Sequence, residues 1–178
     1  MTKLVWSSRF RRRLLRNLAL VLLALAVSGG VPPGAAADII VARNTRHLSF
    51  TASLSPDVVR SGGKLSLVVN IVPKKKMHVY APGTQYRPVT VMLNKSAWLK
   101  PGKTDYPKPS LYHFKPLKEQ VLVYSEPFKL TTPIAIGTIP ARMKQVKISG
   151  TLSYQACDDR VCYLPESVPL EWVVPVRR

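Results

Sequence analysis

The 178-residue sequence predicts an all-β fold, an immunoglobulin-like antiparallel β-sandwich. After residue 37, apolar and polar residues alternate with period two over most of the chain, which is typical of half-buried strands. Prolines and glycines separate these segments as turns. No stretch of ten or more residues in this part has the 3.6-residue period of a helix. Sandwiches of this type contain about 100 residues in seven to nine short strands, a size that residues 38–178 accommodate with modest extensions.

Residues 1–37 are expected to be a secretory signal peptide and not part of the fold. Lys3 and five arginines precede the uncharged apolar run Leu18–Val27, which glycines, prolines and the small residues of "AAAD" follow. This order predicts export to the periplasm, with cleavage after Ala37. The alternative is an uncleaved membrane anchor, but a spanning helix needs about 20 apolar residues. Arg16 and Asn17 interrupt the run, so cleavage is favoured.

The remainder, residues 38–178, is expected to form one domain of short strands. "HLSFTASLS" alternates Leu48, Phe50, Ala52 and Leu54 with small polar residues, and the other segments have similar patterns or β-branched composition. The predicted strands cover residues 47–55, 64–72, 77–81, 88–93, 120–124, 128–136, 145–157 and 167–174.

Residues 101–116 are predicted to form a long loop. Four prolines occur there, at positions 101, 107, 109 and 116. Because proline lacks the backbone N–H that a sheet ladder needs, this segment is not expected to be a central strand. Long loops in compact domains are often functional.

The chain is strongly basic, with a formal net charge of +18. Six of the 27 basic residues and none of the nine acidic residues precede Asp38, which leaves +12 on residues 38–178. Such a charge raises the question of nucleic acid, but export argues against that partner. Anionic lipid headgroups or an acidic protein fit better, and simple solubility is the alternative. We expect a monomer.

The two cysteines, Cys157 and Cys162, flank four residues in "YQACDDRVCYLPE". Residues that flank a four-residue hairpin loop have Cα atoms about 4.5–5.5 Å apart, within the range of a disulfide. In an exported protein such a bridge persists. It would be a weak staple, because closing so short a loop contributes only about 2 kcal/mol. An exposed hairpin disulfide is, in contrast, accessible to exchange with another thiol.

The residues alone leave three interpretations of this pair open: a redox centre, a structural staple and part of a metal site. Asp158 and Asp159 disfavour a thiolate, whereas Arg160 favours one. A zinc site needs four ligands and a blue-copper site needs two histidines near one cysteine. No histidine has the usual spacing from either cysteine, so metal is the weakest interpretation and no cofactor is expected.

The histidines and aromatic residues have ordinary interpretations as well. His47 and His113 are expected on the surface or in loops, and His78 is expected to be a structural histidine with its hydrogen bonds satisfied, in a strand with Tyr80. Tyr112, Phe114 and Tyr124, in or just after the proline-rich segment, either pack locally or belong to a lid over the disulfide. No hydrolase triad, phosphate-binding glycine loop or paired carboxylates are evident.

Three segments resemble a known family, the amino-terminal periplasmic domain of the thiol:disulfide interchange protein DsbD. "SGTLSYQACDDRVCYLPESVPLEW", beginning at Ser149, resembles the cysteine hairpin of that family and the strand after it, and includes Tyr154. "VPKKKMHVYAPG" resembles an aliphatic strand leading into His-x-Tyr and a Pro-Gly turn. "VLVYSEPFKLTTPI" resembles the strand pair before the cysteine strand. Together they cover most of residues 48–174.

The resemblance implies a reversible, catalytic disulfide between Cys157 and Cys162 on an immunoglobulin-like domain. It implies that Cys162 forms the mixed disulfide and that Cys157 resolves it, by thiolate attack on sulfur without a cofactor. The implied partners are thioredoxin-like proteins, with a place in cytochrome c biogenesis as a protein-disulfide reductase-type component. An aromatic cap over the disulfide is implied too, at Leu117 in an ungapped alignment or at Phe114 with a small gap.

This sequence also departs from the family. Better-known members have one more residue between the cysteines. The membrane carrier and carboxy-terminal thioredoxin domain of full-length members are absent here, so we expect a membrane electron carrier to act in trans. The rival interpretation is an exported, non-catalytic binding or chaperone module with a structural hairpin disulfide.

Overall fold

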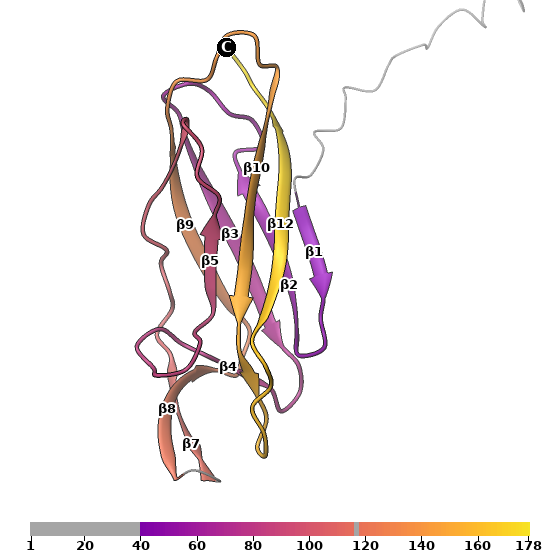
Figure 1. Cartoon of the computed structure of the whole chain (residues 1–178), viewed down its shortest axis with the longest axis vertical. Helices are drawn as coiled ribbons and strands as arrows, with labels where there is room; N and C mark the ends of the chain where they lie inside the picture. Colours follow the sequence, from indigo (N-terminus) through magenta and orange to yellow (C-terminus); the bar gives the residue numbers. More distant parts are fainter. Residues whose placement is uncertain (1–39, 116–117) are drawn as a thin grey trace, which may run out of the picture. The chain divides into compact units, whose positions relative to one another are not determined.

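The computed structural model describes residues 40–115 and 118–178, which belong to one compact unit (Figure 1). The signal-peptide prediction and Leu117 lie outside the described residues. Within them the chain is all-β and the sheets are antiparallel, as predicted. The strands are β1 Ile40–Asn44, β2 Leu48–Ser55, β3 Lys64–Pro73, β4 His78–Tyr80, β5 Thr90–Leu93, β6 Leu99–Pro101, β7 Ser110–Phe114, β8 Glu119–Tyr124, β9 Phe128–Ile136, β10 Gln145–Tyr154, β11 Ala156–Cys157 and β12 Glu166–Pro175.

Two of the three sheets enclose the main core. One has the strand order β1-β2-β3-β9-β6 and the other the order β12-β10-β5. The inward positions are those that the alternation predicts, because successive side chains of a strand point to opposite faces. Leu67 and Ile71 of β3 and Ile148 and Leu152 of β10 are fully buried in one cluster. Trp172 of β12 donates its indole N–H to the carbonyl of Ala52 in β2, at 3.3 Å, and so links the two sheets.

A third sheet carries the cysteine hairpin. Its strand order is β11-β4-β8-β7, and β4 and the β7–β8 hairpin lie together at one end of the unit (Figure 1). The prediction of one continuous strand over residues 145–157 is wrong. The strand breaks at Gln155, because β10 pairs with β12 and β5 whereas β11 pairs with β4. This break moves Cys157 out of the main sandwich and onto the third sheet.

The predicted loop over residues 101–116 contains a strand. β7 occupies residues Ser110–Phe114 and pairs with β8 alone. Pro107 and Pro109 precede its first residue, so they remove no ladder hydrogen bond, and an edge strand needs only one ladder. The expectation that this segment is not a central strand is therefore confirmed. Strands β1 and β6 were not predicted from the pattern.

Candidate functional site

Cys157 and Cys162 form a disulfide across a four-residue turn, as the spacing suggested. Their Cα atoms are 4.1 Å apart. Hydrogen bonds close the hairpin on both sides of the bridge: Asp158 N–H donates to the Val161 carbonyl at 3.0 Å, and Tyr163 N–H donates to the Ala156 carbonyl at 2.9 Å. The bridge therefore lies within one hairpin and does not tie the two sheets of the sandwich together.

The two cysteines differ in their access to solvent. Cys157 is 0% exposed, under the aromatic side chains of the third sheet, whereas Cys162 is exposed. Val161 and Leu164 beside it are exposed as well. Cys162 is therefore the cysteine of the pair that a thiolate from another protein can reach.

Asp158 holds the turn between the cysteines. Its Oδ1 accepts the backbone N–H groups of Arg160 and Val161, each at 2.8 Å, and its Oδ2 accepts the Tyr163 hydroxyl at 2.9 Å. Because these donors favour the ionised carboxylate, led by the Val161 and Arg160 amides, the pKa of Asp158 is lowered. In addition to its charge effect on a thiolate, Asp158 thus stabilises the turn.

Replacing Asp158 by alanine is expected to loosen this turn. Backbone hydrogen exchange at Arg160 and Val161 should accelerate, because both N–H groups lose their acceptor. In the unchanged protein the same protection should persist above the usual carboxyl pKa of about 4. It should fall as the pH drops through the lowered pKa of Asp158. Amide exchange followed by NMR measures both effects.

Asp159→Ala is the matched control for this prediction. The Asp159 carboxylate accepts the Tyr112 hydroxyl at 2.8 Å and is not the acceptor for the Arg160 and Val161 amides. Exchange at these two amides should therefore stay close to that of the unchanged protein. Equal acceleration in both variants would contradict the role assigned to Asp158.

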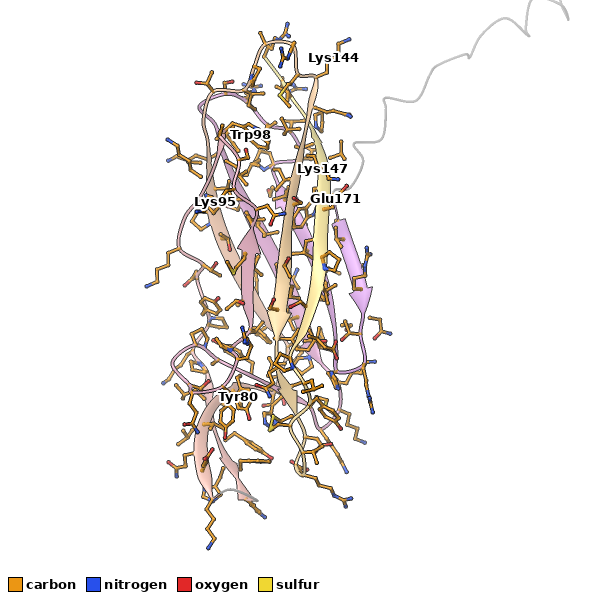
Figure 2. The ribbon with its side chains drawn as sticks, viewed as in Figure 1. Tyr80, Lys95, Trp98, Lys144, Lys147 and Glu171 are labelled. Atoms are coloured by element: carbon orange, nitrogen blue, oxygen red, sulfur yellow. A yellow bond between two sulfur atoms is a disulfide. The ribbon has the colours of Figure 1, made fainter. Side chains whose placement is uncertain are left out.

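The Tyr80 hydroxyl lies beside the disulfide, at nearly equal distances from the two sulfur atoms. It is 3.0 Å from Cys157 Sγ and 3.1 Å from Cys162 Sγ, and Figure 2 shows Tyr80 at the end of the unit that carries β4 and β8. Since both sulfurs are in the disulfide, the hydroxyl is the donor. Burial, followed by the neighbouring Tyr86 and Glu119, raises the pKa of Tyr80 to about 12. Tyr80 therefore remains a protonated donor at neutral pH.

Tyr86 and Glu119 support the Tyr80 ring. Tyr86 stacks on it with ring centroids 4.3 Å apart and an interplanar angle of 10°. The Tyr86 hydroxyl donates to Glu119 Oε2 at 2.5 Å, and this hydrogen bond is the main reason that the pKa of Tyr86 is raised. The sequence pattern offered no signal for this contact, because residues 81–89 form an irregular connection between β4 and β5.

His78 lies next to the disulfide, although no histidine is close to either cysteine in sequence. It is 3% exposed in β4, as expected for a histidine in a strand, and is in register with Cys157 of β11. The Tyr112 ring of β7 lies over it, with centroids 4.2 Å apart, and the Tyr112 hydroxyl continues to Asp159. Strand pairing thus brings residues 78, 112, 157 and 159 together.

The three proposed cap residues lie in different places. Phe114 is buried at the end of β7, on the same sheet face as Tyr112, and Leu117 lies outside the described residues. Tyr124 is in register with Val79, which is also in register with Ala156. It therefore occupies the face of the sheet opposite to Cys157, where its ring stacks on Phe128. Tyr124 is not placed to shield the disulfide, and the cap stays a prediction for Phe114 and Leu117.

The other two histidines differ from each other. His113 is exposed on β7, as expected. His47 lies in the loop between β1 and β2, within the expectation of a surface or loop position, but it is buried there, at 4% exposed. Its ring packs on Tyr163 with centroids 4.3 Å apart, and its Nδ1 is 2.7 Å from Glu166 Oε1. The Tyr154 hydroxyl donates to the other oxygen of Glu166 at 2.6 Å.

The described residues were also searched for a metal site and for a membrane-spanning helix. Among residues 40–115 and 118–178, no group of three or more histidine, cysteine, aspartate or glutamate side chains is arranged to hold a metal ion. Within the same residues, no helix has the length and apolar character that a membrane span requires.

Comparison with solved structures finds a similar fold in one of the structures that align with the chain. The chain aligns with the N-terminal periplasmic domain of ScsB from Proteus mirabilis with a TM-score of 0.53 and 13% identity, over 76% of this chain and 51% of that one. The chain thus spans about half the length of that structure. The reduced N-terminal domain of DsbD from Neisseria meningitidis aligns with a TM-score of 0.42 and 15% identity, over 62% of this chain and 78% of that one.

Comparison of sequences identifies the family. No curated protein matches the chain. The family described as "Thiol:disulfide interchange protein DsbD, N-terminal" matches residues 44–170, a range that contains the cysteine hairpin, β4 and the β7–β8 hairpin. This match covers well over half of the chain and includes the segments whose resemblance was noted from the sequence, except for Glu171 and Trp172 at the end of one of them. The chain therefore belongs to the family of DsbD N-terminal domains.

Proposed function

We propose that this protein is a thiol-disulfide exchange module that passes reducing equivalents between thioredoxin-like proteins through the Cys157–Cys162 disulfide. The observation that carries the proposal is the unequal exposure of the two cysteines in one short hairpin, with Cys157 buried and Cys162 exposed. A bridge that served only stability would gain more by closing a longer loop, and family membership supports the same function.

Exchange would proceed through Cys162. A donor thiolate attacks Cys162 Sγ, a donor–Cys162 disulfide forms, and Cys157 leaves as a thiolate. The second thiol of the donor then displaces Cys162, so that the donor leaves oxidised and both cysteines are reduced. With an oxidised acceptor the steps reverse: the Cys162 thiolate attacks the acceptor disulfide, and Cys157 then attacks Cys162 Sγ and releases the reduced acceptor.

Tyr80 is placed to assist the first step, in which Cys157 leaves as a thiolate. Its hydroxyl is already 3.0 Å from the sulfur that becomes negative when the bridge opens. Hydrogen bonding to a charged form favours that form, so the hydroxyl would stabilise the Cys157 thiolate as it leaves. Because Tyr80 is held by Tyr86 and is buried, this donor is in position before the reaction begins.

The cellular setting is part of the same proposal. We assign residues 1–37 to a cleavable signal peptide and residues 38–178 to the exported domain, which would act as a monomer in the periplasm. Its electron donor would be a membrane carrier in trans, and its acceptors would include proteins of cytochrome c biogenesis. The basic charge of the chain supports contact with an anionic membrane surface.

The proposal predicts that the bridge equilibrates with a reduced thioredoxin-like protein at a potential above about −300 mV. Incubation in buffers of graded thiol potential, followed by acid quenching and alkylation, measures the reduced fraction. A bridge that stays oxidised against reduced thioredoxin, together with loss of folding in Cys157→Ala, would instead favour a binding module with a structural disulfide.

A further inference from the structure

His78 has a buried nitrogen that no hydrogen-bond partner satisfies among residues 40–115 and 118–178. This atom is Nε2. Buried polar atoms in folded proteins are nearly always paired, and an exception at a reactive site often has a chemical use. The site here is the disulfide, because His78 of β4 and Cys157 of β11 are directly opposed in an antiparallel pair.

The strand register places the His78 and Cys157 side chains next to each other on one face of the sheet. Directly opposed residues of an antiparallel pair project from the same face, with Cβ atoms about 4.5–5.5 Å apart. The same face carries Tyr80, two residues after His78, whose hydroxyl touches Cys157 Sγ. The Tyr112 ring covers His78 from β7. His78 and the buried sulfur thus share one enclosed space.

The groups that face His78 determine its charge. From its own strand they include Tyr80, from β7 Tyr112, from β11 Cys157, and from the turn Asp158 and Asp159. Burial lowers the pKa of His78, and the two carboxylates partly oppose that effect. The imidazole is therefore neutral at neutral pH, with one nitrogen able to accept a proton.

The neighbouring groups are less suited to accept a proton from Cys157. Tyr80 is a protonated donor with a pKa of about 12. The Asp158 carboxylate accepts three hydrogen bonds from the turn and from Tyr163. The Asp159 carboxylate accepts the Tyr112 hydroxyl. Among these neighbours of Cys157, His78 Nε2 is the buried atom without a hydrogen-bond partner.

We propose that His78 accepts the proton of the Cys157 thiol when Cys157 resolves a mixed disulfide on Cys162. The Cys157 S–H proton moves to His78 Nε2 while Cys157 Sγ attacks Cys162 Sγ. The Cys157–Cys162 bond forms, the bond between Cys162 and the partner breaks, and the partner leaves as a thiolate. In the opposite direction Cys157 leaves as a thiolate, and His78 Nε2 takes up a proton from water and passes it to that thiolate. This assignment rests on the proposed exchange function.

The test separates the two steps with a chromogenic disulfide, dithiobis(nitrobenzoate). Attack by Cys162 of the reduced protein releases one coloured thiolate, and resolution by Cys157 releases the second. In His78→Gln, the second phase should slow by roughly 100-fold near neutral pH, the size typical of a lost general base. The first phase should change less than about twofold, because Cys162 bears the attacking sulfur there. His113→Gln, an exposed histidine of the same sheet, should match the unchanged protein in both phases.

The unchanged protein supplies a second test that does not depend on how the variant folds. The rate of the second phase should rise with pH up to the pKa of His78, measured by NMR titration of its ring, and then level off. A rate that keeps rising about tenfold per pH unit above that pKa would indicate attack by a pre-formed thiolate and would overturn the assignment.

The outcomes distinguish the two proposals. Two normal phases with an unchanged second phase in folded His78→Gln would overturn the role of His78 and leave the exchange function standing. Failure of the reduced, unchanged protein to release either coloured thiolate would overturn the exchange function, and the role of His78 with it.

Discussion

Replacing Cys162 by alanine is expected to abolish exchange, whereas replacing Cys157 by alanine is expected to trap the partner. In Cys162→Ala the remaining thiol is the buried one, which is 0% exposed beneath Tyr80 and its neighbours. Such a thiol reacts only when the structure opens. Because open forms have populations of about 10⁻³ or less, reaction should be slower by roughly 10³-fold or more.

In Cys157→Ala the exposed Cys162 keeps its access and loses the thiol that resolves the mixed disulfide. It should therefore accumulate a covalent complex with its partner. Alkylation rates of the two variants with iodoacetamide measure the difference in access. Non-reducing electrophoresis of periplasmic extracts, followed by mass spectrometry, identifies what Cys157→Ala retains.

Similar alkylation rates in both folded variants would contradict the assignment of roles to the two sulfurs. Loss of trapping in both variants, with normal folding, would remove the main support for exchange. The double variant without cysteines is the control for complexes that form without a disulfide.

Replacing Trp172 by alanine is expected to cause a large loss of stability. Trp172 is 2% exposed and is among the largest buried side chains. Truncating a buried tryptophan costs about 3–5 kcal/mol, and its hydrogen bond to the Ala52 carbonyl contributes about 1 kcal/mol within that loss. For a protein of this size, a loss of about 4 kcal/mol lowers the midpoint of thermal unfolding by roughly 8–16 °C.

Val173→Ala is the matched control, because this neighbour in β12 points to the other face and is 49% exposed. Its truncation should cost less than about 1 kcal/mol, since little apolar area leaves water on folding. Urea unfolding with the disulfide intact measures both free energies of unfolding. Equal losses in the two variants would contradict the assignment of the core to this face of β12.

Much of the fold could be predicted because period-two alternation reports which face of a strand is buried. Leu48, Phe50, Ala52 and Leu54 of β2 are all buried, as their pattern indicates. The predicted strands were wrong where the pairing between strands outweighs the local sequence pattern. The segment rich in proline includes an edge strand, β7, and the apparent single strand up to Cys157 divides between two sheets at Gln155.

The candidate site, like the fold, could be predicted from the sequence only in part. The sequence by itself determined the disulfide hairpin and the family, because both depend on residues that are close together in the chain. Tertiary structure decided which sulfur is buried and which groups surround it. Tyr80, His78 and Tyr112 reach the hairpin through the pairing of β11 with β4, of β4 with β8 and of β8 with β7. Their distance from the cysteines along the chain leaves no local signal, because strand register is set by long-range pairing and by the burial of one face.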